Sequence, residues 1–301
     1  MKFFSKYRKT LDSLKFILLQ TQINKNLMVS KNKSIYLWIF AVIFTISSAI
    51  YQRLTGPTHP KKATVSIKGE SYTFKLIRSH GGEGDAEIEL DLPKNLTGTV
   101  EYRAYKSKKS WTSIPMISKG EKAVAELPHQ PPAGKLEYII KLYDGMDVYQ
   151  LNEDPVVIRF KGRVPLYILI PHIMFMFTAM LMSTRTGIEA LFKGHRTLKF
   201  ANITIISLFI GGLILGPLVQ LMAFGDLWTG WPFGGDWTDN KTIFAFTFWL
   251  IAILSLRKNK NARLWPIIAF LVLFGMYMIP HSMGGSELNT ETGKIETGLK
   301  K

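Results

Sequence analysis

Two histidines, each directly after a proline, are the residues of this sequence best suited to chemistry. His172 lies within an apolar run, and His281 lies at the end of another. An ionisable side chain within a membrane span indicates function, because hydrocarbon offers it no water for hydrogen bonding. The structural alternative is a buried imidazole that hydrogen-bonds to Gln220 or Tyr277.

Two cofactor hypotheses follow from these histidines. Met176 lies four residues after His172, and Met278 lies three residues before His281, so each pair would share one face of a helix. Imidazole and thioether ligands together suit copper(I). Haem b is the second candidate, with His172 as one axial ligand and His281 or a methionine as the other. Neither spacing is specific, because methionine is also an ordinary packing residue.

Tryptophan and aspartate are concentrated in residues 225–241, GDLWTGWPFGGDWTDNK, here called the Trp/Asp loop. Its glycines and proline predict turns, and Asp239 with Asn240 would cap the following helix. The tryptophans also fit an aromatic belt at a membrane interface. So many side chains of these types in a short connection nevertheless predict that something packs on the loop or binds to it. The candidate ligand-binding or partner-binding residues are Gln220, Trp228, Trp231, Asp236, Trp237 and Asp239.

Catalytic signatures are weak in this sequence. It contains no G-x-S-x-G elbow, H-E-x-x-H pair or glycine-rich phosphate loop. His281 and Ser282 are adjacent, with Asp236 or Asp239 as an orienting acid, but adjacency alone does not make a catalytic dyad. Cysteine is absent, which excludes disulfides, thiolate metal sites and cysteine nucleophiles. The sequence therefore favours a protein that is not an enzyme.

The composition indicates membrane helices joined to a soluble domain. The 301 residues have a mean hydropathy of +0.10, although 20% of them are charged. Such a chain is apolar in blocks and polar elsewhere, unlike a uniformly mixed globular protein. The net charge of +16 comes mainly from the N-terminal segment, the polar region and the loops. This placement fits membrane orientation better than nucleic-acid binding.

Five apolar runs are long enough to be transmembrane helices. They cover residues 35–51, 164–182, 200–224, 242–256 and 264–280. Lysine and arginine are concentrated between the second and third runs and between the fourth and fifth runs. The first of these basic loops is predicted to include Arg185. The Trp/Asp loop instead has three aspartates and one lysine. The positive-inside rule therefore predicts a bacterial inner-membrane protein with a cytoplasmic N-terminus and an outward-facing loop and C-terminus.

The segments beside these runs have distinct expected roles. Residues 1–34 form a basic cytoplasmic tail, in which residues 15–20 are suited to lie on anionic lipid. Translation from Met28 would remove most of this tail. The third run contains Gly212 and Gly216, a spacing that allows close helix packing, followed by a proline that predicts a kink.

Residues 63–162 change to short runs in which polar and apolar residues alternate. Eight such runs, separated by glycine, proline, asparagine and aspartate, predict a β-sandwich of roughly seven or eight strands. A stiff linker, residues 52–62, precedes it. The stretch 127–138, LPHQPPAGKLEY, resembles the tyrosine corner of immunoglobulin-like and fibronectin type III domains, where the Tyr138 hydroxyl would bond to upstream backbone. The resemblance implies a periplasmic recognition or spacing module.

The predicted fold is an α+β membrane protein with this sandwich inserted between the first and second of five transmembrane helices. We expect an accessory or recognition protein that docks an envelope protein or a ligand through the sandwich and the Trp/Asp loop. A haem-binding or copper-binding redox protein centred on His172 and His281 is the alternative. Membrane lipid is an expected partner, and nucleic acid is not. The outer tail, residues 281–301, is expected to be flexible, although Ser286 to Asn289 could fold back onto the loop.

Overall fold

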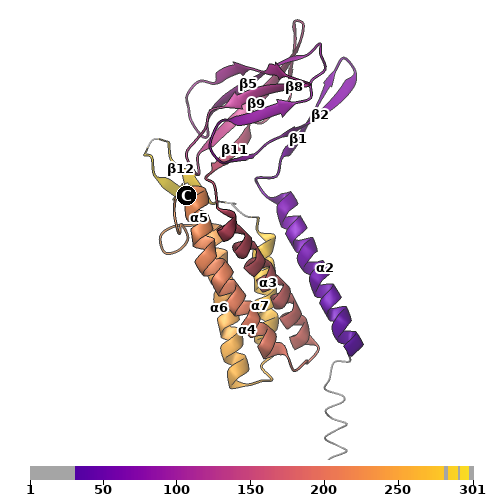
Figure 1. Ribbon diagram of the computed structural model, residues 1–301, viewed down its shortest axis with the longest axis vertical. Helices are drawn as coiled ribbons and strands as arrows, with labels where there is room; N and C mark the ends of the chain where they lie inside the picture. Colours follow the sequence, from indigo (N-terminus) through magenta and orange to yellow (C-terminus); the bar gives the residue numbers. More distant parts are fainter. Residues whose placement is uncertain (1–30, 281–283, 291, 298–301) are drawn as a thin grey trace, which may run out of the picture. The chain divides into compact units, whose positions relative to one another are not determined.

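The computed structural model describes residues 31–280, 284–290 and 292–297 (Figure 1). The predicted surface segment at 15–20, the alternative start at Met28 and His281 lie outside these residues. The chain divides into two compact units. One unit comprises Met1–Ala49, Phe175–Phe209 and Phe244–Tyr277, and the other comprises Ile50–Met174, Ile210–Ile243 and Met278–Lys301.

Four helical segments among the described residues are long and apolar enough to cross a membrane. They correspond to α2 (Lys31–Thr55), α3 (Leu166–Leu191), the continuous run from α4 (Thr197–Leu208) to α5 (Gly216–Phe224), and α6 (Trp237–Lys258). α7 (Leu264–Met278) is apolar but has 15 residues, fewer than the roughly 20 of a typical span. The structure therefore supports a membrane protein, while the fifth span stays a prediction.

A π-helical segment, η1 (Phe209–Leu215), connects α4 to α5. Pro217 follows it in the first turn of α5. Proline has no N–H group, and its ring clashes with the carbonyl four residues earlier, so the preceding turn must deviate from α-helical geometry. α5 ends at Gly225, whose φ of +89° gives the left-handed conformation typical of a helix C-terminus.

Small and aromatic side chains form the core of the helical unit. Alanines from α3, α4, α6 and α7 are buried together, and Trp249 of α6 is fully buried among them. Small residues let membrane helices approach closely, because packing replaces the hydrophobic effect as the attraction between them. Phe44 of α2 joins this core, with its ring 4.8 Å from that of Phe274.

Arg185 lies inside α3, so its prediction as a loop residue was wrong. Its Nη1 atom is 2.6 Å from Oε2 of Glu189, one helical turn later, and both side chains are 2% exposed. Its guanidinium also lies 5.4 Å from the ring of Trp38 and 5.0 Å from that of Phe200. A buried charge needs such partners, because removal from water is costly.

The second unit contains a β domain of eleven strands between α2 and α3. Each of the eight predicted runs contains one, while β3, β6 and β7 are additional and only three or four residues long. Strands this short show little alternation in sequence. The strands are β1 (Lys61–Ile67), β2 (Glu70–Leu76), β3 (Ser79–Gly81), β4 (Ala86–Leu90), β5 (Thr97–Ala104), β6 (Thr112–Pro115), β7 (Ile117–Lys119), β8 (Lys122–Leu127), β9 (Lys135–Asp144), β10 (Asp147–Gln150) and β11 (Val156–Lys161).

One apolar core joins the sheets of the β domain. The largest sheet has the order β3-β11-β9-β5-β6 with β10 on β9, a second has the order β4-β8-β7, and β1 pairs with β2. All these pairings are antiparallel except that of β11 with β3. Sheets that share one core give a sandwich-like architecture, but this strand order does not establish an immunoglobulin-like fold.

Tyr138 is fully buried in β9, and its hydroxyl donates a hydrogen bond to the carbonyl of Ile77 (2.8 Å). The hydroxyl thus bonds to upstream backbone, as the tyrosine-corner resemblance implies. The partner follows β2, however, whereas a tyrosine corner uses a residue only a few positions upstream. Burial raises the pKa of Tyr138, so the hydroxyl remains a donor.

The described part of the tail forms a short hairpin. The expected return of this segment to the loop is confirmed, because Ser286 hydrogen-bonds to Thr229 and Asp236, whereas the expected flexibility was wrong for residues 292–297. β12 (Ser286–Leu288) pairs with β13 (Ile295–Thr297) in antiparallel register. Asn289 closes the turn, because its amide N–H donates to the Lys294 carbonyl (2.9 Å). Gly293 in this turn has a φ of +68°, a left-handed conformation that glycine adopts without strain.

Glu189→Gln tests the buried ion pair. Glutamine keeps an acceptor for the Arg196 amide, which lies 3.2 Å from Oε1, but leaves Arg185 buried without a counter-charge. We expect the free energy of unfolding, measured in mixed detergent micelles, to fall by about 3 kcal/mol. The double variant with Arg185→Met removes the unpaired charge as well and should be more stable than Glu189→Gln alone. Equal stability of the single and double variants would contradict the pairing.

Candidate functional site

Asp239, in the first turn of α6, organises the Trp/Asp loop, whose last five residues are helical. Its Oδ2 atom accepts hydrogen bonds from the amides of Thr229 (2.7 Å) and Gly230 (2.9 Å). The same oxygen accepts a third from the side-chain amide of Gln220 (3.1 Å). A buried carboxylate needs several donors, because they replace the water it has lost. Asp239 and Gln220, both predicted to bind a partner, are therefore buried and hold the loop together.

Asp236 is the N-cap of α6, which corrects the prediction that Asp239 and Asn240 cap this helix. Its Oδ1 atom accepts a hydrogen bond from the Thr238 amide (2.7 Å), as an N-cap side chain does. Its Oδ2 atom accepts from the hydroxyl of Thr229 (3.0 Å) and from the amide of Ser286 (3.2 Å). The loop interior thus includes a residue of the tail.

The aromatic side chains of the loop differ from its carboxylates in being accessible. Phe233 is 83% exposed and Trp231 is 70% exposed, and Trp237 and Leu227 are also exposed. Trp228 is partly buried, and its indole N–H donates to the carbonyl of Trp231 (3.1 Å). The predicted binding residues therefore separate into a buried polar set and an exposed aromatic set.

Sequence reasoning missed Thr229, which completes the buried polar set together with Ser286. The Thr229 hydroxyl lies 3.1 Å from the Ser286 hydroxyl and accepts a hydrogen bond from Gln220 (2.8 Å). The two hydroxyl residues are separated by all of α6 and α7 in the chain, so no local pattern connects them. The signal for this contact in the sequence was Ser286, a small hydroxyl residue directly after two glycines of the tail.

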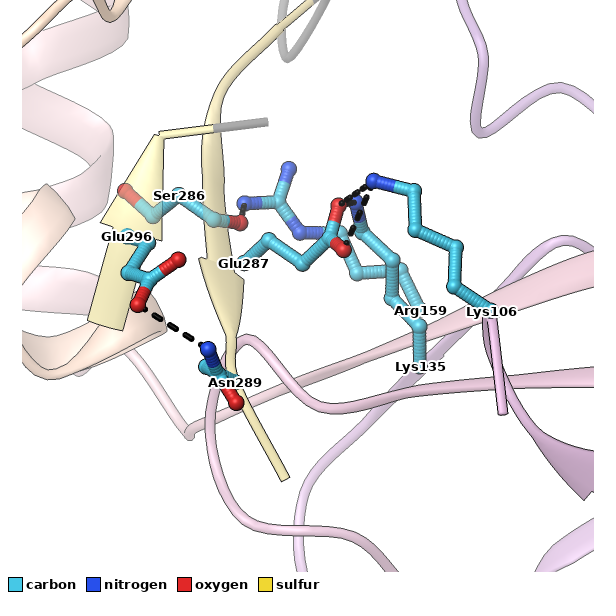
Figure 2. Close-up of polar contacts among 7 residues, drawn as sticks. All are labelled: Lys106, Lys135, Arg159, Ser286, Glu287, Asn289 and Glu296. Carbon is cyan, nitrogen blue, oxygen red and sulfur yellow. Dashed lines mark hydrogen bonds and ion pairs between the residues drawn. The ribbon is translucent and has the colours of Figure 1, made fainter. Parts of the chain in front are cut away.

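The tail also binds the β domain (Figure 2). The Glu287 carboxylate lies 3.0 Å from the Lys106 ammonium and 2.7 Å from that of Lys135. The Arg159 guanidinium donates a hydrogen bond to the Ser286 carbonyl. Together these contacts connect the loop interior, through the tail, to strands β9 and β11 and the end of β5.

Burial and ion pairing shift the pKa values of these charged groups in opposite directions. Burial alone would raise the pKa of Glu287, but hydrogen bonds from Lys135 and Lys106 outweigh it and lower this pKa. Burial lowers the pKa of Lys135, although Glu287 opposes the shift. Burial also lowers the pKa of Arg159 to about 10, so the guanidinium remains charged at neutral pH.

The structure does not test the two histidine hypotheses, because His281 lies outside the described residues. His172 contacts backbone instead of Gln220 or Tyr277, because its Nδ1 atom lies 2.9 Å from the Gly211 carbonyl in η1. The Tyr277 hydroxyl donates to the carbonyl of Met176 (2.8 Å). The described residues contain no group of three or more histidine, cysteine, aspartate or glutamate side chains suited to a metal ion. Because His281 lies outside them, its distance from His172 stays untested.

Comparisons with known proteins place this chain in no family. Neither protein-family models, nor curated proteins, nor solved structures match it. Function must therefore be inferred from the geometry and chemistry of the site.

Asp239→Ala tests the role of the buried carboxylate. The change leaves the Thr229 and Gly230 amides without their acceptor, so we expect the free energy of unfolding to fall by about 2 kcal/mol. Limited proteolysis of the detergent-solubilised protein should then cleave the Trp/Asp loop faster. Asp226→Ala removes a partly exposed aspartate of the same loop and should change stability by less than about 0.5 kcal/mol. Similar effects of the two variants would contradict the assigned role.

The lowered pKa of Glu287 predicts a pH dependence of tail docking. A carboxyl group whose pKa is lower in the folded state stabilises that state above its ordinary pKa of 4.5, and the stabilisation is lost as pH falls through the folded value. Glu287→Gln should therefore lower the melting temperature at neutral pH. The difference from the unmodified protein should shrink below about pH 4. A difference that stays constant down to about pH 3 would contradict the ion-pair contribution.

Proposed function

We propose that this chain is a non-enzymatic accessory or recognition protein of the bacterial inner membrane. It docks an envelope protein or a ligand at its outer face through the β domain and the Trp/Asp loop. The supporting observation is an exposed apolar surface, here called the aromatic surface. It consists of Trp231, Phe233 and Trp237, together with Leu227.

The aromatic surface is not needed to close the loop. The loop interior is held by hydrogen bonds to Asp236 and Asp239, and these involve backbone amides, Gln220 and hydroxyl groups. Exposed apolar clusters mark interaction sites, since exposure to water is unfavourable unless a partner or lipid covers them. Tryptophan supplies large contact area at low entropic cost and is enriched at binding hot spots. A rigid loop that displays such side chains is suited to recognition.

The finer topology is part of the same proposal. Five helices span the membrane, and the β domain is an immunoglobulin-like or fibronectin III-like recognition module on the outer side. Removing Arg185 from the basic loop leaves the charge asymmetry intact. Four basic residues lie at the end of α6 or in the connection from α6 to α7. Three more lie in the connection from α3 to α4 or in the first turn of α4. These are Arg257, Lys258, Lys260 and Arg263, and Lys193, Arg196 and Lys199.

The haem or copper hypothesis has no comparable support. His172 contacts a backbone carbonyl, and His281 lies outside the described residues. The aromatic surface, by contrast, is described completely and explains why the loop contains more aromatic residues than a connection requires.

Site-specific photocrosslinking in cells tests the proposed docking. A photoreactive phenylalanine analogue at position 233 should crosslink to one envelope protein. Trp231→Ala should reduce that product at least tenfold, since hot-spot aromatics contribute about 2 kcal/mol or more, which is about thirtyfold in affinity. Position 146 is the matched control, because Met146 is fully exposed in the turn between β9 and β10. The same analogue there should not give this product. Crosslinks to lipid alone at position 233 would overturn the proposal and assign the aromatic surface to the membrane interface.

A further inference from the structure

Three cations of the β domain converge on one short segment of the tail. Figure 2 shows the ammonium groups of Lys106 and Lys135 at the Glu287 carboxylate, and Arg159 beside the carbonyl of Ser286. Two of these cations pair with the single carboxylate of the segment, and Asp236, which accepts a hydrogen bond from the Ser286 amide, also interacts electrostatically with Arg159. The site is therefore suited to one acidic side chain with hydrogen-bonded backbone beside it.

Arg159 is the most buried of the three cations, with 6% of its surface exposed. Its guanidinium lies 3.8 Å from the ring centroid of Phe224. The buried Nε–H group has no hydrogen-bond partner among the described residues. Arginine recognises carboxylates through paired N–H groups, so an unused buried N–H group points to an additional acceptor.

The backbone at this site is strained at two positions. Lys106 has a φ of 61° and Ala133 has a φ of 65°, both in the left-handed region that residues with a Cβ atom rarely adopt. The Ala133 carbonyl accepts a hydrogen bond from the Leu288 amide (3.1 Å), and Lys106 binds Glu287. Such conformations persist where the surrounding structure maintains them, and they are concentrated at functional sites.

A cavity of about 310 Å³ lies beside this segment. Its lining includes Lys106 and Lys109 from the β domain, together with Leu288 and Asn289 from the tail. The ring of Tyr105 also lines it and lies 4.9 Å from the Lys106 ammonium and 5.2 Å from that of Lys135. The site therefore has room next to Glu287 for side chains larger than those of the tail.

We propose that Lys106, Lys135 and Arg159 form a binding site for an acidic peptide, and that Ser286–Leu288 occupies this acidic-peptide site as an intramolecular ligand. A competing peptide would bind in the same extended form, with its backbone hydrogen-bonded to the β domain and an acidic side chain between the two lysines. This inference does not depend on the proposed function, because the aromatic surface can bind a partner whichever peptide occupies the site.

The contacts of the tail define the expected peptide. Ser286 is fully buried beside Asp236, so the residue before the acidic one must be small. Leu288 follows it as the apolar residue of the segment, and the cavity beside Leu288 leaves room for a larger side chain. The site therefore favours peptides of the type Ser-Glu-apolar.

A peptide fits this site better than a phosphate group or a nucleic acid. Two tail amides, those of Ser286 and Leu288, donate hydrogen bonds to protein acceptors. Phosphate has no N–H groups to match these acceptors. One of the acceptors is the buried carboxylate of Asp236, which would repel a polyanion at short range.

Peptide binding to the full-length protein in detergent tests this inference. Glu287→Ala removes the competing carboxylate, so this variant should bind a fluorescein-labelled peptide of sequence 284–297 at least about tenfold more tightly than the unmodified protein. A peptide with glutamine in place of the glutamate should bind at least about tenfold more weakly. In the same background, Lys135→Met should abolish binding. Lys122→Met, which removes a lysine that pairs with Glu89 elsewhere on the β domain, should leave it unchanged.

Hydrogen exchange in the unmodified protein provides a second measurement that needs no destabilising change. Excess glutamate peptide should displace the tail and accelerate exchange at the amides of Ser286 and Leu288, whereas the glutamine peptide should not. Equal binding of the two peptides, or competition by inorganic phosphate at similar concentration, would overturn the acidic-peptide site. So would the absence of binding in both experiments. Neither result bears on the aromatic surface, because no envelope partner is present in these measurements.

Discussion

A carboxylate removed from water must be surrounded by donors, and this constraint shapes the described part of the loop and tail. Asp239 gathers the amides of Thr229 and Gly230 on one oxygen. Asp236 begins α6 and also receives the amide of Ser286 from the tail. Because the two carboxylates share Thr229 as a neighbour, the loop, the helix start and the tail form one hydrogen-bonded structure. Glu287 then extends it to the β domain through its two lysines.

This arrangement separates the polar and aromatic residues of the Trp/Asp loop. The side chains of Asp236 and Asp239 are buried and accept hydrogen bonds from backbone amides, while Trp231 and Phe233 remain exposed. Stability and recognition therefore depend on different side chains of the same loop. A partner that binds the aromatic residues would meet a surface whose shape is already set by buried contacts, so little conformational entropy would be lost on binding.

The same physical constraint applies in the helical unit, where Arg185 is neutralised by Glu189 and covered by the rings of Trp38 and Phe200. Pairing one turn apart on α3 keeps both charges within a single helix, so the pair can form before the helices associate. The aromatic contacts then connect α3 to α2 and α4. As a loop residue, Arg185 would contribute to membrane orientation. As a residue of α3, it contributes to helix packing.

Local features of the sequence determined the secondary structure, because apolar length and alternation are properties of neighbouring residues. They indicated the long apolar helices and a strand in each of the eight runs, and within the β domain they missed β3, β6 and β7, which are three or four residues long. The tertiary structure decided which polar residues are buried. Nothing in local spacing connects Ser286 with Asp236 or distinguishes Asp239 from an exposed binding residue, since their contacts join segments far apart in the chain. A periodic pattern reports which face of an element is apolar, whereas a buried hydrogen bond depends on what packs against that face.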